Sequence, residues 1–454
     1  MLNKKQRIFL LINLLFITIV ILLNYLNFFS DRIKNRSELI NKVGENINIR
    51  AWVCQEREER EDNSKLVLCY KNERILVTTN LYQKYSYGDE LEIKGKINLA
   101  EKFNSFDYPS YLLRYQIQSI IYYPNIKKIG EKSLNFWQKK YKSLLSFKQK
   151  IREMVNVSLP EPCASLANAM LLGYKKSLSI ESKEIFSKTG LSHLVAISGA
   201  HLSIISSLIL NFLMFLNFSK KRANYLVIVF LIIFPILSGL SASCVRAALM
   251  AFFLIVANLF NRLKKTLSPL ILTASIMLII NPLLIFYDIG FQLSFLAVLG
   301  IIYLFPLLEK FKKIILKKCK IKIFKKTISV LLSYLNISIA VQIFCLPIIV
   351  KNFQIVSGLS FLANILVIWI FPLIFISLII AIILSFIFPA FLLVFFYPSY
   401  VFLRYLYEVA RYLASFDLVF YINEIKSFHI FIYYIVLYII IKKLINKKII
   451  KDVG

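Results

Sequence analysis

The sequence predicts an α-helical polytopic membrane protein of about ten spans, with a small OB-like all-β extracytoplasmic domain near its N-terminus. Three observations carry this prediction. Hydrophobic residues make up 58% of the 454 residues, apolar runs dominate beyond residue 190, and residues 35–130 alternate polar and apolar side chains. Globular proteins are about 45–50% apolar. Lipid must therefore solvate much of the chain, which excludes a soluble enzyme, a disordered chain and a fibrous repeat.

The first segment has the charge and hydropathy pattern of a membrane anchor. Residues 1–7 are basic and residues 8–29 are apolar. A signal peptide has a shorter apolar run and ends at a small-residue cleavage site, and this segment has neither feature. We expect residues 1–34 to form an uncleaved transmembrane anchor whose N-terminus is cytoplasmic, which places residues 35–130 outside the cytoplasm.

Residues 35–130 contain several short segments with period-two alternation, separated by turn residues. This pattern predicts strands, and so many strands in a short domain favour a small closed barrel of the OB type. Cys54 and Cys69 lie on neighbouring predicted strands, with a charged stretch between them. Because the domain is placed in an oxidising compartment, we expect these two cysteines to form a disulfide.

Residues 131–189 place apolar side chains at helical spacing with Lys and Arg between them. The pattern predicts amphipathic helices that lie along the membrane interface. Residues 190–454 then form the polytopic core, in which we expect one span over 193–216. The apolar run 357–386 is long enough for one tilted span or two short ones.

The positive charges mark the cytoplasmic side. Lys and Arg number 56 against 25 acids, and the segment 309–327 holds nine Lys and one Glu. Such Lys-rich loops between apolar runs are typical of cytoplasmic loops. An even number of spans then also places the basic C-terminus in the cytoplasm. Contact between these loops and an anionic partner remains an open alternative.

Polar residues interrupt three of the predicted spans, and we expect them to line a shared polar path. They are His193, Ser198, Gly199 and His201 in the first, Ser243 and Arg246 in the second, and Asp288, Gln292 and Ser294 in the third. The spacing of the two histidines would put them on one helical face. Two structural alternatives stay open: the histidines could bind backbone groups, and Arg246 could pair with Asp288. With three histidines in the chain and no CxxC pair, we expect no metal site.

Three ordered motifs resemble the ComEC competence proteins, a family of inner-membrane channels for transforming DNA. The matching residues are Gly190, His193, Leu194, Ser198, Gly199 and His201, then Gly239, Ser241, Ser243, Arg246 and Ala247, then Asn281, Pro282 and the run from Gly290 to Phe295. The resemblance implies a membrane channel that takes up single-stranded DNA. Many members carry a nuclease domain with a His-x-His-x-Asp-His motif. This sequence lacks that motif, so we expect a separate nuclease rather than an enzyme here.

The resemblance also implies partners and a second contact site for DNA. Single-stranded DNA binds aromatic platforms and basic grooves, which Trp52 with Arg50, Lys71 and Arg74 would supply in the barrel. The alternative that the barrel aromatics are core and membrane-belt residues stays open. The sequence has no phosphate-binding loop for a nucleotide, so we expect no cofactor. A cytoplasmic helicase-type motor and a DNA receptor are then expected partners beside the lipid bilayer, and a homo-oligomer is left open. The alternatives are an intramembrane hydrolase and a small-solute or lipid transporter on a similar scaffold.

Overall fold

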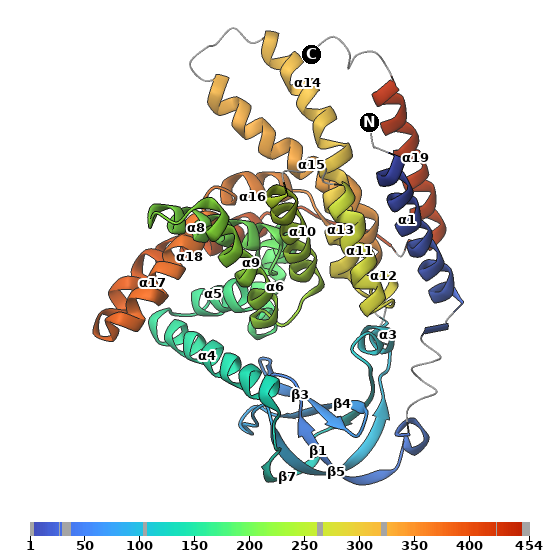
Figure 1. The fold of residues 1–454 in the computed structure, drawn as a ribbon, viewed down its shortest axis with the longest axis vertical. Coiled ribbons are helices and arrows are strands. Elements are labelled where there is room, and N and C mark those ends of the chain that lie inside the picture. Colours follow the sequence, from blue (N-terminus) through green and yellow to red (C-terminus); the bar gives the residue numbers. More distant parts are fainter. Residues whose placement is uncertain are drawn as a thin grey trace.

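The computed structural model places a β-barrel beneath a large assembly of helices, with the long helix α4 (Phe136–Ser158) leading from one to the other (Figure 1). It describes residues 4–446, apart from 27, 30–37, 103–106, 261–266, 319–324 and 424.

Five strands close into a ring, which confirms the prediction of a small barrel. They are β1 (Asn46–Val53), β3 (Asn63–Tyr70), β4 (Glu73–Asn80), β5 (Asp89–Leu99) and β6 (Ile117–Tyr122). Their order is β1-β3-β4-β6-β5, and β5 pairs with β1 to complete the ring. All of these pairs are antiparallel except β4 with β6. The short strands β2 (Glu58–Glu59) and β7 (Asn125–Glu131) extend β3 and β5.

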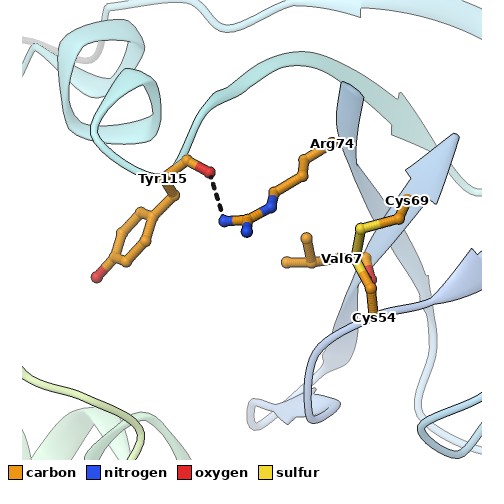
Figure 2. The surroundings of a disulfide bond; sticks show 5 residues. All are labelled: Cys54, Val67, Cys69, Arg74 and Tyr115. Carbon is orange, nitrogen blue, oxygen red and sulfur yellow. Dashed lines mark hydrogen bonds between the residues drawn. A yellow bond between two sulfur atoms is a disulfide. The ribbon is translucent and has the colours of Figure 1, made fainter. Parts of the chain in front are cut away.

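The period-two alternation sorts the strand side chains between the inside and the outside of the barrel. Val53, Leu68 and Ile75 lie in the barrel core, whereas the next positions in register face outward. On the outer face, Cys54 and Cys69 form a disulfide with their Cα atoms 5.7 Å apart (Figure 2). The backbone N–H of Cys54 donates to the carbonyl of Val67 at 3.1 Å, so the disulfide covers the end of the β1–β3 pairing.

Two segments connect the barrel to the helical part. The short helix α3 (Tyr108–Leu113) lies between β5 and β6 and, in Figure 1, sits below α12 (Leu284–Tyr287). Helix α4 begins at a capping box formed by Asn135 and Gln138, which satisfies first-turn N–H groups. Helix α4 is amphipathic, and the placement of residues 131–189 along the membrane interface stays a prediction. The next helix, α5 (Cys163–Leu172), is buried over its whole length in the helical core.

The remaining elements form the membrane domain and are mostly helices. They are α1 (Lys4–Tyr25), α6 (Ile180–Lys188), α7 (Ser192–Val195), α8 (Gly199–Phe215), α9 (Lys220–Leu237), α10 (Ala242–Leu259), α11 (Leu267–Ile280), α13 (Ile289–Tyr303), α14 (Phe305–Lys318), α15 (Lys325–Phe353), α16 (Ser360–Val367), α17 (Phe371–Ile387), α18 (Leu392–Ala414) and α19 (Ser427–Asn446), together with a small sheet of β8 (Ile355–Ser357) and β9 (Val419–Tyr421).

Several of these helices are long and apolar enough to cross a bilayer, so the chain is a multi-pass membrane protein. Within the described residues there are five, or six if α16 and α17 count as one span bent by 45°. The expected count of about ten spans is not confirmed. The run 357–386, expected to form one tilted span or two short ones, contains the two helices α16 and α17, which can still count as one broken span.

The expected start of the span over residues 193–216 is wrong. Residues 193–216 do not form a continuous helix, because α7 ends at Val195 and α8 begins at Gly199. Ser198 has extended backbone angles and acts as the N-cap of α8, with His201 as the third residue of its capping box. Ser at an N-cap starts a helix because its side chain and backbone satisfy first-turn groups. The break leaves a helix N-terminus inside the membrane domain.

The disulfide gives a direct test of the barrel's compartment and stability. Denatured protein prepared without reductant should expose four thiols of the six cysteines, because Cys54 and Cys69 are joined. Reduction should raise the count to six. The bond closes a loop of 15 residues, so Cys54→Ser should lower the free energy of unfolding of the barrel by about 3 kcal/mol. Six reactive thiols before reduction would contradict the assignment.

Candidate functional site

The predicted polar residues lie where three helices begin inside the membrane domain. Helix α8 begins at Gly199, α10 at Ala242 and α13 at Ile289. The first N–H groups of a helix have no partner within the helix, so each of these starts presents polar backbone groups. The structure brings them together. A Cβ added at Gly199 would lie 3.1 Å from Nη2 of Arg246 on α10, and Ser243 Oγ donates to the carbonyl of Gly290 on α13 at 3.2 Å.

Arg246 is buried at this junction, and no carboxylate among the described residues pairs with it. Only 7% of the residue is exposed. Its Nη1 donates to Sδ of Met250 at 3.4 Å, and its Nε has no hydrogen-bond partner. Its guanidinium carbon lies 6.0 Å from the centre of the Phe295 ring. Nη2 also faces the first residue of α8, the positive end of that helix dipole. The cation is therefore buried beside further positive potential.

The alternative in which Arg246 pairs with Asp288 is wrong. Asp288 instead forms a salt bridge with Arg114, which follows the last residue of α3. The side chains of Arg114 and Asp288 are 9% and 10% exposed. Asp288 also serves as the N-cap of α13, since its Oδ1 accepts from the backbone N–H of Phe291 at 2.8 Å. One carboxylate thus starts α13 and binds the connection between β5 and β6 of the barrel.

Aromatic rings fix the guanidinium of Arg114. Its central carbon lies 4.2 Å from the ring centre of Tyr111 and 4.6 Å from that of Tyr115, distances typical of cation–π contacts. Burial lowers the pKa of Arg114, but Tyr115, Asp288 and Tyr111 raise it by more, so the group stays charged. Asn281 donates to the carbonyl of Arg114 at 2.8 Å. The backbone and side chain of Arg114 are both bound to the membrane domain.

Sequence reasoning did not identify Arg114. The segment YLLRYQ places an Arg next to Tyr115, which could have drawn attention to Arg114. Its partner, Asp288, is far away in the sequence. A pairing between residues so distant in the chain leaves no local pattern. Asp288 had a recognisable position at a helix start, whereas the identity of its partner depends on how the barrel docks.

A second contact holds the barrel through its acidic loop. Glu56, Glu58 and Glu59 follow β1 and form ion pairs with Lys148, Lys176 and Arg152, respectively. The Lys148–Glu56 pair is 2.7 Å long, and the Lys148 side chain is only 3% exposed. Burial lowers the pKa of Lys148 more than Glu56 raises it. The loop residues are thus neutralised by α4 and by the segment after α5.

The two histidines do not share one helical face, because the break at Ser198 separates them. His193 lies exposed in α7, with Nδ1 3.0 Å from the carbonyl of Gly190. His201 is fully buried in the first turn of α8, and its ring contacts those of Phe371 and Phe375. Its Nδ1 accepts from the backbone N–H of Ser198 at 3.1 Å. No group of three metal ligands occurs among the described residues.

The other predicted residues of the third motif lie on α13. The Gln292 side chain donates to the carbonyls of Ile285 and Phe286, at 2.8 and 3.0 Å. It therefore satisfies the end of α12 where that helix meets α13. Ser294 is half-buried one turn after Gly290. These contacts explain how the chain can break between α12 and α13 within an apolar surrounding.

The four barrel residues proposed for DNA binding lie on the outer surface, and most have partners. Trp52, Cys69 and Arg74 are opposite one another across β1, β3 and β4. Arg74 donates to the carbonyl of Tyr115 at 3.1 Å (Figure 2). Lys71 pairs with Glu38 at 2.8 Å. Arg50 lies opposite Glu92 in the β1–β5 register. This face is therefore mixed in charge, in contrast to a basic groove.

The Arg114–Asp288 pair can be tested by charge removal. Removing one member of a buried ion pair leaves an uncompensated charge, which costs about 3–5 kcal/mol. Arg114→Ala and Asp288→Ala should each reduce the fraction of protein that survives heating in detergent. The double variant should recover much of that loss. Arg246→Ala combined with Asp288→Ala serves as the matched control and should show no recovery. Recovery in the control alone would contradict the pairing.

Comparisons with known proteins agree with this reading of the motifs. Residues 170–446 match the family model described as "Competence protein", which is more than half of the chain. A segment of 211 residues is 30% identical to "ComE operon protein 3" of Bacillus subtilis (strain 168). That alignment covers 46% of this chain and 26% of the relative. No solved structure matches the chain. The chain therefore belongs to the ComEC family of competence proteins.

Proposed function

We propose that this protein is a membrane channel through which single-stranded DNA enters the cell during competence. Membership of the family supports a role in DNA uptake. The observation that carries the proposal is Arg246, a buried cation without a carboxylate partner among the described residues, at the junction of α8, α10 and α13. The polar path expected from the sequence would run through this junction.

The energetics of Arg246 favour an anionic ligand. A charged side chain within a membrane domain is costly and normally requires a compensating partner or a polar cavity. Asp288 cannot offset this cost because it is bound to Arg114. The N-terminus of α8, next to Nη2 of Arg246, would also be stabilised by a negative charge. A phosphodiester supplies that charge and two oxygen acceptors for the planar guanidinium.

We propose that the protein conducts DNA and that other proteins perform the enzymatic steps. The sequence has no phosphate-binding loop, so a cytoplasmic helicase-type motor would supply the energy. A separate nuclease and a DNA receptor would complete the system.

The hydrolase alternative rests on one observation. Ser198 Oγ lies 2.8 Å from Nδ1 of His201, a distance that suits a nucleophile and a base. However, Nδ1 also accepts from the backbone of Ser198, and Nε2 has no hydrogen-bond partner. The ring packs against Phe371 and Phe375, and no carboxylate among the described residues binds it as the third member of a catalytic triad would. We infer that the pair caps α8.

We propose that the barrel lies outside the cytoplasm. In Figure 1 the start of α1, the end of α19, the end of α14 and the start of α15 all lie at the end of the molecule away from the barrel. The end of α14 belongs to the Lys-rich segment 309–327, as expected for the cytoplasmic side. Both termini then share one side, which requires an even number of passes. The five long helices, the bent pair, α9 and the apolar parts of α1, α8 and α11 would together supply the expected ten passes.

This orientation predicts the behaviour of a reporter fused at Lys318. A reporter that functions only in the cytoplasm should be active, because the surrounding segment is Lys-rich and lies opposite the barrel. A second fusion in the barrel, near Lys84, should be inactive with the same reporter. Activity confined to the fusion near Lys84 would show that the topology is the reverse of the one proposed.

Substitution of Arg246 tests the conduit. Arg246→Ala should reduce entry of labelled transforming DNA by at least about tenfold, because a charge-assisted contact contributes about 1.5–3 kcal/mol. Arg246→Lys should retain part of the entry, since Lys keeps the charge but not the planar fork. Arg222→Ala removes an exposed Arg at the start of α9 and is the matched control. Normal entry with Arg246→Ala at a normal protein level would exclude this role.

A further inference from the structure

A chain of two contacts leads from the barrel to the helix that carries Arg246. Arg114, after α3 of the barrel, is bound to Asp288 at the N-cap of α13. Two residues later, the carbonyl of Gly290 accepts from Ser243 Oγ at 3.2 Å. Ser243 and Arg246 are three positions apart on α10 and therefore lie on the same side of that helix. A shift of α3 would therefore act on the start of α13 and, through the Ser243–Gly290 contact, on the side of α10 that carries Arg246.

The contact is built so that α13 can separate from α3 without unfolding. Asp288 has two oxygens with different roles: Oδ1 caps α13 by accepting from Phe291, and Oδ2 binds Arg114. Loss of Arg114 would leave the cap in place. On the other side, Arg114 remains packed between Tyr111 and Tyr115. Each partner therefore keeps its local structure when the ion pair opens.

The surroundings of Arg114 suit a nucleic-acid phosphate in place of the carboxylate. A guanidinium binds phosphate in the same bidentate way as carboxylate, and aromatic rings beside it offer a surface on which a base can stack. Tyr111 and Tyr115 both lie within 5 Å of the guanidinium carbon. Burial raises the pKa of Tyr111, but Lys176, Arg114 and Lys175, with a hydrogen bond to Tyr115, lower it by more, so the surroundings are positively charged.

We propose that the Arg114–Asp288 pair is a latch that keeps the start of α13 closed against α10 until a single-stranded DNA phosphate takes Arg114. The proposal rests on the proposed function, because it assigns DNA as the releasing ligand. When the phosphate binds Arg114, Asp288 is freed, the start of α13 can move away from Ser243, and the junction at Arg246 becomes accessible from the barrel side. Binding at the barrel and opening of the path are thereby coupled.

A thiol at the junction can report the state of the latch. Ser243→Cys places it on the contact with Gly290, in a chain where Cys163, Cys244, Cys319 and Cys345 are replaced by Ala. The reaction rate with a membrane-impermeant maleimide is measured in intact cells, where the barrel side is exposed. Asp288→Asn should raise this rate by at least about tenfold, because Asn still caps a helix but no longer pairs with Arg114.

Two further arms separate the latch from general loosening of the barrel. Lys148→Gln is the matched control. It breaks the buried pair between Lys148 on α4 and Glu56 of the barrel but leaves α13 untouched, so the labelling rate of the thiol should stay unchanged. A short oligothymidylate added to the chain with an intact latch should raise the rate, and Arg114→Gln should abolish that response. If Asp288→Asn fails to accumulate, the rate for Arg114→Gln without the oligothymidylate replaces it, because this change removes the same ion pair from the Arg114 side.

Each outcome has a definite meaning. Equal rates for Asp288→Asn and its parent, or an equal increase with Lys148→Gln, would overturn the latch. An increase with Asp288→Asn but no response to the oligothymidylate would overturn DNA as the releasing ligand. The proposed function fails separately, through normal DNA entry in Arg246→Ala cells. Equal labelling rates for Asp288→Asn and its parent, together with DNA entry that depends on Arg246, would support the channel and exclude the latch.

Discussion

The buried ion pair between Arg114 and Asp288 determines how the two parts of this protein fit together. It joins the loop before β6 to the start of a membrane helix, and it occupies Asp288, the carboxylate that the sequence suggested as a partner of Arg246. The acidic loop at Glu56–Glu59 also holds the barrel against the membrane domain, through its ion pairs with Lys148 and Arg152 on α4. In an OB-fold, the loops after the first and fourth strands often hold ligands. Here both corresponding loops contact the membrane domain.

Two breaks, between α7 and α8 and between α12 and α13, place polar backbone inside an apolar domain, and side chains satisfy each of them. Ser198 and His201 cap α8, Asp288 caps α13, and Gln292 binds the last carbonyls of α12. Irregular backbone at membrane depth is tolerated only where protein or a water-filled cavity surrounds it. Arg246 lies among these breaks with its Nε unpartnered. The arrangement resembles the discontinuous helices with which transporters bind anions.

Much of the fold could be predicted from the sequence because its signals are local. Alternation with period two gave the barrel strands, and apolar runs gave the long helices such as α15 and α19. The start of α8 was missed because the residues around Ser198 are apolar enough to continue a span, while the cap depends on backbone angles. The partner of Asp288 was missed because Arg114 reaches it only after the barrel docks. Local patterns identified which residues are polar at the site, whereas their pairing depends on tertiary structure.

The central claim is that single-stranded DNA passes the junction of α8, α10 and α13, and cross-linking during uptake tests it most directly. A photoreactive amino acid at Met250, which contacts Arg246, should form adducts with labelled DNA trapped midway through entry. The same amino acid at Ile232, an exposed position on α9, should form none. Adducts at position 250 that contain a single strand are the predicted result. Adducts absent at 250 in cells that are actively taking up DNA would contradict the account.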